Sequence, residues 1–113
     1  MAQYLISFED GAMTFPDEEL PDVAAAALEV ARRAKDAGVW VFSAGLEHRE
    51  TMSVVAVDGM VTDGPYPENR ERLGGFAVVD VPSRKEALEW AAQIAVACLC
   101  AQEVRELLAE PSG

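Results

Sequence analysis

The chain alternates between short runs of β-branched and aromatic residues and two longer stretches with helical periodicity. In those two stretches apolar residues recur three or four positions apart, which predicts helices over residues 21–37 and over 84–97 or slightly beyond. Short apolar runs bounded by turn residues predict strands. These strands are expected at residues 4–8, 39–44, 52–57, 60–62, 76–81 and 103–108.

Local chemistry supports the ends of both predicted helices. Pro21 suits a first helical turn, where its missing N–H is not needed, and Gly38 suits the position after the helix ends. Ser83 followed three residues later by Glu86 is a capping-box pattern that starts the second helix. The two helices are therefore predicted from their boundaries as well as from their periodicity.

Two further elements are predicted by shorter signals. Asp58-Gly59 lies between two β-prone runs and predicts a hairpin with a type I′ turn, in which both residues have positive φ. The segment 102–108 is open to two interpretations: it could form the last strand, or its residues could extend the second helix.

The predicted order is β-α-β-β-β-α-β, which indicates an α+β fold. Two βαβ-like halves around a hairpin favour a ferredoxin-like antiparallel sheet with both helices on one face. The other face then needs a cover, and a second copy related by a two-fold axis would supply it, so we expect a homodimer. No internal repeat or linker is seen, so one domain is expected over 1–110, with a flexible tail at 111–113.

The net negative charge of the chain argues against anionic partners such as nucleic acids and membranes. Twenty acidic and nine basic residues among 113 give a formal net charge of −11, which repels a phosphate backbone or an anionic membrane surface. No apolar stretch is long enough to span a bilayer, and the first residues lack a signal-peptide pattern. We expect a cytoplasmic protein that binds neither nucleic acid nor membrane.

Cysteine and histidine content gives no metal or cofactor motif. Cys98 and Cys100 are two positions apart, so on a helix they point in different directions and cannot readily bond to each other. Two thiols and one distant histidine do not form a zinc site. We expect reduced, partly buried thiols, no metal and no cofactor.

Candidate catalytic residues are Asp63 and His48. Asp63 follows a predicted strand and precedes Gly64-Pro65, where its carboxylate could act as a general base; the alternative is an Asx turn. His48 is the only histidine, and it would form an acid–base dyad if it reached Asp63 across the sheet. The alternative is an exposed loop histidine beside Arg49.

Candidate ligand-binding residues follow in the same loop. Tyr66 could place its hydroxyl in a pocket, or its ring could pack on the loop with the hydroxyl in water. Glu68 and Arg70 could hold an anionic ligand, or they could form a solvated surface pair.

One block of sequence resembles a known family. Val-Thr-Asp-Gly-Pro-Tyr-Pro-Glu at 61–68, followed by Leu-Gly-Gly-Phe at 73–76, resembles the signature of the DGPF-type YCII-related proteins, and the match extends from residue 4 to about 105. The resemblance implies a dimeric α+β barrel and says little about activity. Tyr66, Pro67 and Arg70 depart from the usual Phe, Ala and Lys, and the histidine used by other branches near the first helix has no counterpart here.

Two functions are compatible with these observations. The chain could bind or transform a small molecule in a pocket between the sheet and the loop 63–72, or it could be a non-catalytic dimeric accessory or regulatory module. The sequence does not decide whether the protein is an enzyme.

Overall fold

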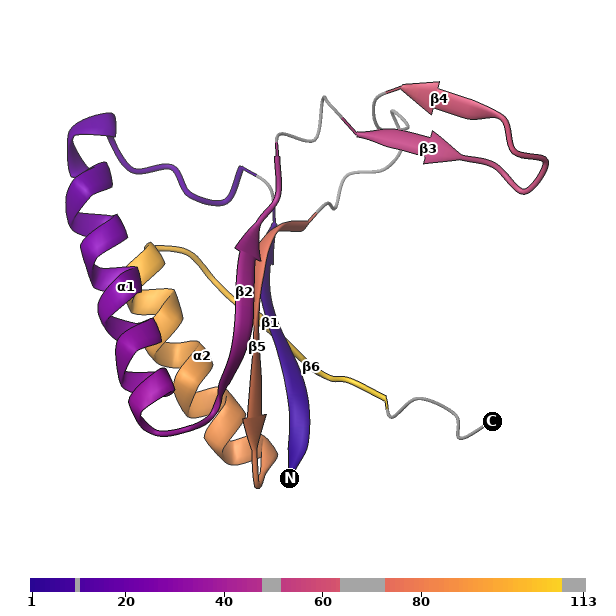
Figure 1. Cartoon of the computed structure of the whole chain (residues 1–113). Coiled ribbons are helices and arrows are strands. Elements are labelled where there is room, and N and C mark those ends of the chain that lie inside the picture. The colour runs from indigo at the N-terminus through magenta and orange to yellow at the C-terminus, as the bar shows by residue number, and fades with distance from the viewer. Residues whose placement is uncertain (10, 48–51, 64–72, 109–113) are drawn as a thin grey trace.

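The computed structural model describes residues 1–9, 11–47, 52–63 and 73–108 (Figure 1). In chain order the elements are β1 (Ala2–Glu9), a short 3₁₀ turn η1 (Asp17–Glu19), α1 (Leu20–Asp36), β2 (Trp40–Gly45), β3 (Ser53–Val55), β4 (Val61–Asp63), β5 (Leu73–Val81), α2 (Arg84–Cys98) and β6 (Glu103–Glu106). The predicted order is confirmed, and the last element is a strand. The predicted tail at 111–113 lies outside the described residues.

The main sheet has the strand order β2-β5-β1-β6, and every adjacent pair is antiparallel. Both helices cover the same face of this sheet (Figure 1). This is the ferredoxin-like α+β arrangement that the element order predicts. β5 is flanked on both sides, which agrees with its nearly continuous run of apolar residues.

The helix ends follow the chemistry read from the sequence. Pro21 stands in the first turn of α1, and Gly38, with φ of +77°, follows its last turn. Ser83 Oγ accepts a hydrogen bond from the Glu86 backbone N–H at 3.3 Å and so caps α2. Leu99 ends α2 in the left-handed conformation, with φ of 58°, and turns the chain back towards β6.

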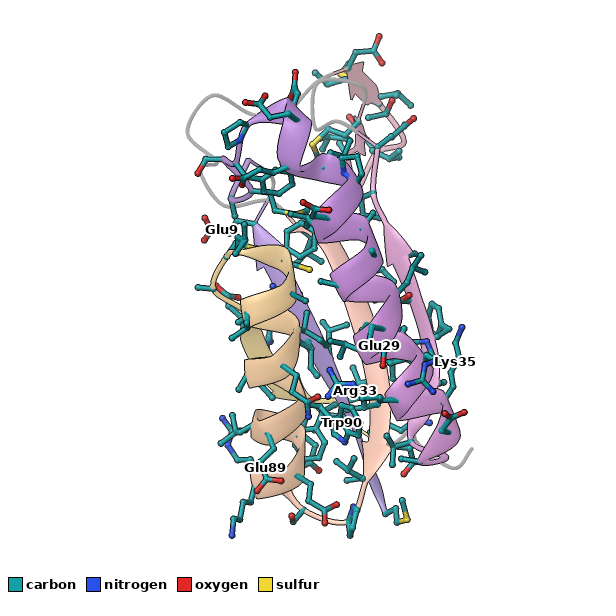
Figure 2. The ribbon with its side chains drawn as sticks, turned by 90° about the vertical axis from the view of Figure 1, so that its left-hand side faces the viewer. Glu9, Glu29, Arg33, Lys35, Glu89 and Trp90 are labelled. Atoms are coloured by element: carbon teal, nitrogen blue, oxygen red, sulfur yellow. The ribbon has the colours of Figure 1, made fainter. Side chains whose placement is uncertain are left out.

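The core lies between the centre of the sheet and α2. Alternate side chains of β1 and β5 point to the helices, and the two strands pair without a register shift from Ala2 to Phe8. The buried cluster consists of Tyr4, Ile6, Val79, Val81, Ala87 and Ala91. Small residues on α2 let this helix approach the sheet closely. The outer side of the helices is charged, and Figure 2 labels Glu29, Arg33 and Lys35 on α1.

The β3–β4 hairpin forms, but its turn is not the one predicted. The Gly59 N–H donates to Ala56 O at 2.8 Å and the Ala56 N–H donates to Met60 O at 2.8 Å, which leaves a three-residue loop over 57–59. Gly59 has φ of +89°, whereas Asp58 is not in the positive-φ region. Instead, Asp58 Oδ1 accepts from the Met60 N–H at 2.9 Å. The type I′ prediction was wrong because this side-chain bond and one left-handed glycine suffice to reverse the chain.

The hairpin is a separate two-stranded sheet that projects from the end of the main sheet (Figure 1). The radius of gyration is 16.0 Å, against about 13 Å for a compact chain of this length. The projecting hairpin contributes to this extended shape (Figure 1). It also carries exposed apolar side chains, among them Val57 and Met60.

The face of the main sheet opposite the helices is apolar at its centre. Phe42 of β2 and Phe76 of β5 meet edge to face there, with ring centroids 5.5 Å apart. Val78 is paired with Phe42 on one side and with Leu5 on the other, and it is nearly inaccessible. Phe42 itself is 51% exposed. No described helix covers this face (Figure 1).

Candidate functional site

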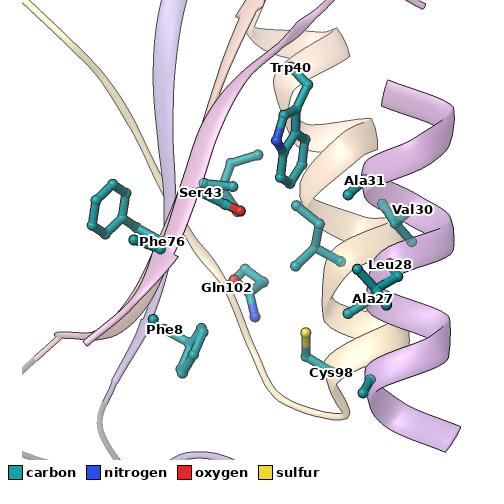
Figure 3. A pocket seen from close by; sticks show the side chains of 16 residues that line it. Phe8, Ala27, Leu28, Val30, Ala31, Trp40, Ser43, Phe76, Cys98 and Gln102 are labelled. Carbon is teal, nitrogen blue, oxygen red and sulfur yellow. The ribbon is translucent and has the colours of Figure 1, made fainter. Parts of the chain in front are cut away.

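A cavity of about 450 Å³ lies between the helix-bearing face of the main sheet and the two helices (Figure 3). Strands β1, β2 and β5, the connection before β6 and both helices contribute to it. Its lining residues are Ile6, Phe8, Ala24, Ala27, Leu28, Val30, Ala31, Trp40, Ser43, Ala44, Gly45, Phe76, Ala77, Ile94, Cys98 and Gln102.

The cavity exists because small residues oppose small residues. Ala24, Ala27 and Ala31 are spaced by three and four positions, so they share one side of α1. Opposite them is the segment 43–45 of β2, which reads Ser-Ala-Gly. Side chains this short cannot fill the space between a helix and a sheet, and interiors elsewhere are close-packed. The volume is therefore encoded by these two segments.

The cavity is lined by both buried and exposed residues, so it reaches from the core to the surface. At its inner end, Ile6 and Val30 are 1% and 3% exposed, whereas Leu28 is 71% exposed at the other end. The Trp40 ring forms part of the wall, as Figure 3 shows. A molecule of suitable size could thus enter from solvent without unfolding a strand.

A close contact fixes the wall next to β1. The Phe8 ring lies against Gly75, where an added Cβ would come within 2.8 Å of Phe8 Cζ. The same Cβ would lie 3.2 Å from the Ala44 carbonyl oxygen. Gly75 therefore lets the ring of Phe8 and the neighbouring strand β2 come together at this end of the cavity.

Three polar side chains line the cavity, namely Ser43, Cys98 and Gln102. Figure 3 shows the Ser43 hydroxyl directed from β2 towards the helices. Gln102 follows the left-handed end of α2, and its amide nitrogen donates to the Cys100 carbonyl at 3.4 Å and lies 3.5 Å from Cys100 Sγ. These contacts hold the Gln102 side chain in place beside the cavity.

The two thiols are free and half-buried, as expected from the sequence. Burial raises the pKa of the Cys98 thiol, and the neighbouring Cys100 raises that pKa further. Burial also raises the pKa of Cys100, against a smaller lowering by the hydrogen bond from Gln102. Cys98 therefore meets the cavity as a neutral thiol at neutral pH, which is a weak donor and a poor nucleophile.

Of the site residues predicted from the sequence, Asp63 is the one within the described chain. It ends β4, is exposed, and accepts a hydrogen bond from Ser53 Oγ at 3.3 Å across the hairpin. It is not among the lining residues of the cavity. The alternative Asx turn to the N–H two residues on cannot form, because residue 65 is a proline.

The remaining candidates, His48, Tyr66, Glu68 and Arg70, lie outside the described residues. The proposed dyad of His48 with Asp63 and the three ligand-binding assignments stay predictions. Among the residues that the structure does describe, no group of three or more His, Cys, Asp or Glu side chains could hold a metal ion.

Sequence reasoning misses the cavity residues Ser43, Cys98 and Gln102 as a group. The sequence predicts that the thiol of Cys98 is partly buried, but nothing in it places Cys98 opposite Ser43. The signal that could have found the cavity is that the alanines at positions 24, 27 and 31 face the short residues 43–45. That signal becomes visible only when the two segments are known to be neighbours.

No helix in the described residues is long and apolar enough to cross a membrane.

Comparison with known proteins identifies the family of the chain. No curated protein matches the sequence. The family model of the YCII-related domain matches residues 2–109, which is nearly the whole chain. The α+β topology described above agrees with the subunit fold that the sequence resemblance implied. The chain belongs to the YCII-related domain family.

Proposed function

We propose that this protein binds a small molecule in the cavity between the main sheet and the two helices. The observation that carries this proposal is the cavity itself, with a volume of about 450 Å³ and a lining that includes solvent-exposed residues such as Leu28. Ligand sites in proteins are typically concave and mostly apolar, of roughly 300–1,000 Å³, with a few polar groups that orient the ligand. Thirteen of the sixteen lining residues are apolar or glycine, and three are polar.

Binding is favoured over acid–base catalysis by the chemistry of the lining. The described residues around the cavity include no Asp, Glu, His, Lys or Arg. General acid–base catalysis needs a titratable group within hydrogen-bond reach of the reacting atom. A raised thiol pKa at Cys98 also argues against a thiolate nucleophile. An uncharged, mainly apolar lining is more typical of a carrier, a sensor or an accessory protein than of a hydrolytic enzyme.

Amide chemical-shift mapping with a small-molecule library tests the proposal. Binding is expected to shift resonances of residues along the cavity, such as Val30, Ser43 and Gln102. Ala27→Leu places a larger side chain into the cavity and should abolish those shifts. Ala25→Leu adds the same atoms at a position outside the lining and should leave them unchanged. Shifts that survive Ala27→Leu would put the binding site elsewhere.

We further propose that the face opposite the helices pairs with a second copy of the chain. Phe42 and Phe76 give it an apolar centre, and Phe42 is half-exposed in the single chain. By register, Glu103 and Arg105 of β6 lie on this same face, because they pair with Ser7 and Leu5. A two-fold axis that passes between these two opposite charges would bring each of them against the other on the second copy.

A further inference from the structure

We infer that the cavity selects neutral, mainly hydrocarbon molecules that carry one or two hydrogen-bonding atoms, and this inference rests on the proposed small-molecule binding. It concerns the class of ligand, which neither the family nor the overall fold determines. Charge, the apolar wall and the three polar side chains support it separately.

The absence of charge on the described lining argues against an ionic ligand. An ion that leaves water for an apolar site loses its hydration, and this loss is recovered only when the site supplies an opposite charge and hydrogen bonds. The described lining residues supply no such charge. An anion is also repelled at longer range by the net charge of −11. A neutral molecule meets neither cost.

The apolar wall of the cavity favours a ligand whose surface is mostly hydrocarbon. Its inner end is formed by Ile6, Val30, Ile94 and the ring of Trp40. These groups offer carbon surface and no acceptor or donor apart from the indole N–H. A ligand part that occupies this end therefore gains by being hydrocarbon, since each buried CH₂ contributes about 0.8 kcal/mol.

The polar side chains fix where the hydrogen-bonding atoms of the ligand belong. The Ser43 hydroxyl can both donate and accept, and it points from β2 towards the helices (Figure 3). The amide nitrogen of Gln102 is engaged by Cys100, which leaves its amide oxygen able only to accept, and the Cys98 thiol is a weak donor. Ser43 is thus the lining group best able to recognise a hydroxyl or carbonyl, and we assign it the role of distinguishing such a ligand from a plain hydrocarbon.

A matched set of probes with one ring system tests the inference. Naphthalene, 2-naphthol, 2-naphthoate and 2-naphthylmethylammonium differ only in the polar group and its charge at neutral pH. Calorimetric titration of the full chain is expected to show the tightest binding for 2-naphthol. Both ions should bind at least tenfold more weakly than 2-naphthol.

Three variants separate the ligand class from the existence of the site. Ser43→Ala should weaken 2-naphthol binding about three- to tenfold and leave naphthalene unchanged. Ala27→Leu should abolish binding of every probe, and Ala25→Leu should change none. If Ala27→Leu does not fold, Ala31→Leu takes its place, because Ala31 also lines the cavity.

The results of these titrations test the ligand class, the role of Ser43 and the existence of the site separately. Ions that bind as tightly as 2-naphthol, with binding lost in Ala27→Leu, would overturn the inferred ligand class and leave small-molecule binding standing. Equal weakening of naphthalene and 2-naphthol by Ser43→Ala would remove Ser43 from its assigned role. No binding by any probe, or binding that Ala27→Leu leaves intact, would overturn the proposed function itself.

Discussion

Cys98 combines a cavity position with an environment that keeps its thiol protonated. It lies at the end of α2, half-buried, and faces the same cavity as Ser43. Burial is the main cause of its raised pKa, because a thiolate would lose hydration there, and Cys100 adds to the effect. The fraction of thiolate at a given pH is therefore smaller than in an unfolded chain.

The alkylation rate of Cys98 should consequently rise at higher pH in the folded protein than in the unfolded one. Iodoacetamide reacts with the thiolate, so its rate in a Cys100→Ser background reports the Cys98 pKa. In urea the midpoint should return to about 8.5, the ordinary value for cysteine. Since part of the shift comes from Cys100, the folded midpoint in this background reflects burial alone. Equal midpoints in the two conditions would show that burial does not act on this thiol.

Residues whose role is set by near neighbours in sequence were predictable. Ser83 caps α2 because its acceptor and the Glu86 N–H are three residues apart. Asp58 correctly predicts the position of the hairpin. It does not predict the turn type, because the turn type depends on which side-chain hydrogen bond forms. Asp63 lies at a strand end as predicted, but its cross-strand partner Ser53 depends on a register that the sequence does not state.

At the level of elements, one glycine, Gly75, lets β1, β2 and β5 pack closely at one end of the sheet. Gly75 pairs with Phe8 in β1 and with Gly45 in β2. The ring of Phe8 occupies the place where a side chain at position 75 would be. At Gly45, by contrast, a Cβ would have no atom within 4 Å, and φ is not positive.

Gly75→Ala and Gly45→Ala should therefore change the free energy of unfolding by different amounts or in opposite directions. Gly75→Ala is expected to lower the free energy of unfolding by about 1–3 kcal/mol, because the Phe8 ring must move and the Ala44 carbonyl is close. Gly45→Ala should be neutral or stabilising by up to about 1 kcal/mol. Urea denaturation of both variants measures the two values. An equal effect of the two substitutions would contradict the close contact at Gly75.

The positions of the helices and strands in the sequence were largely predictable. The way in which these elements pack against one another was not. Periodicity and capping located α1 and α2, and apolar runs located the strands, because both signals are local in sequence. The open choice over 102–108 is settled by pairing of β6 with β1, a contact between the two ends of the chain. The cavity depends on α1 facing β2 through short side chains, which is a property of the packed arrangement.

For the molecule as a whole, the main sheet separates the two surfaces to which the two proposals refer. Its helix-bearing face contains the cavity. Phe76 is among the lining residues, but its ring is directed away from the helices (Figure 3) and contacts that of Phe42 on the other face. Because side chains alternate along each strand, the side chain of Ser43 points to the cavity side while that of Phe42 points away from it. The proposed ligand binding and the proposed pairing of two copies would therefore use different side chains of the same strand β2.

The proposed pairing predicts a dimer that one substitution on this face disrupts. Sedimentation equilibrium of the full chain should give twice the mass of the 113-residue monomer. Phe42→Glu puts a charge at the apolar centre of the face, where pairing would strip it of water, and should shift the equilibrium to monomer. Val96→Glu is the matched control, because Val96 is 76% exposed on α2, on the opposite side of the sheet.

The two variants also separate pairing from folding. Phe42 is half-exposed, so Phe42→Glu should keep the circular dichroism spectrum of the parent and, because the cavity lies on the other face, its ligand binding. A folded Phe42→Glu protein that remains dimeric would move the interface away from this face. A parent chain that sediments as a monomer would show that Phe42 and Phe76 face water, and that their edge-to-face contact serves to limit the apolar area they expose.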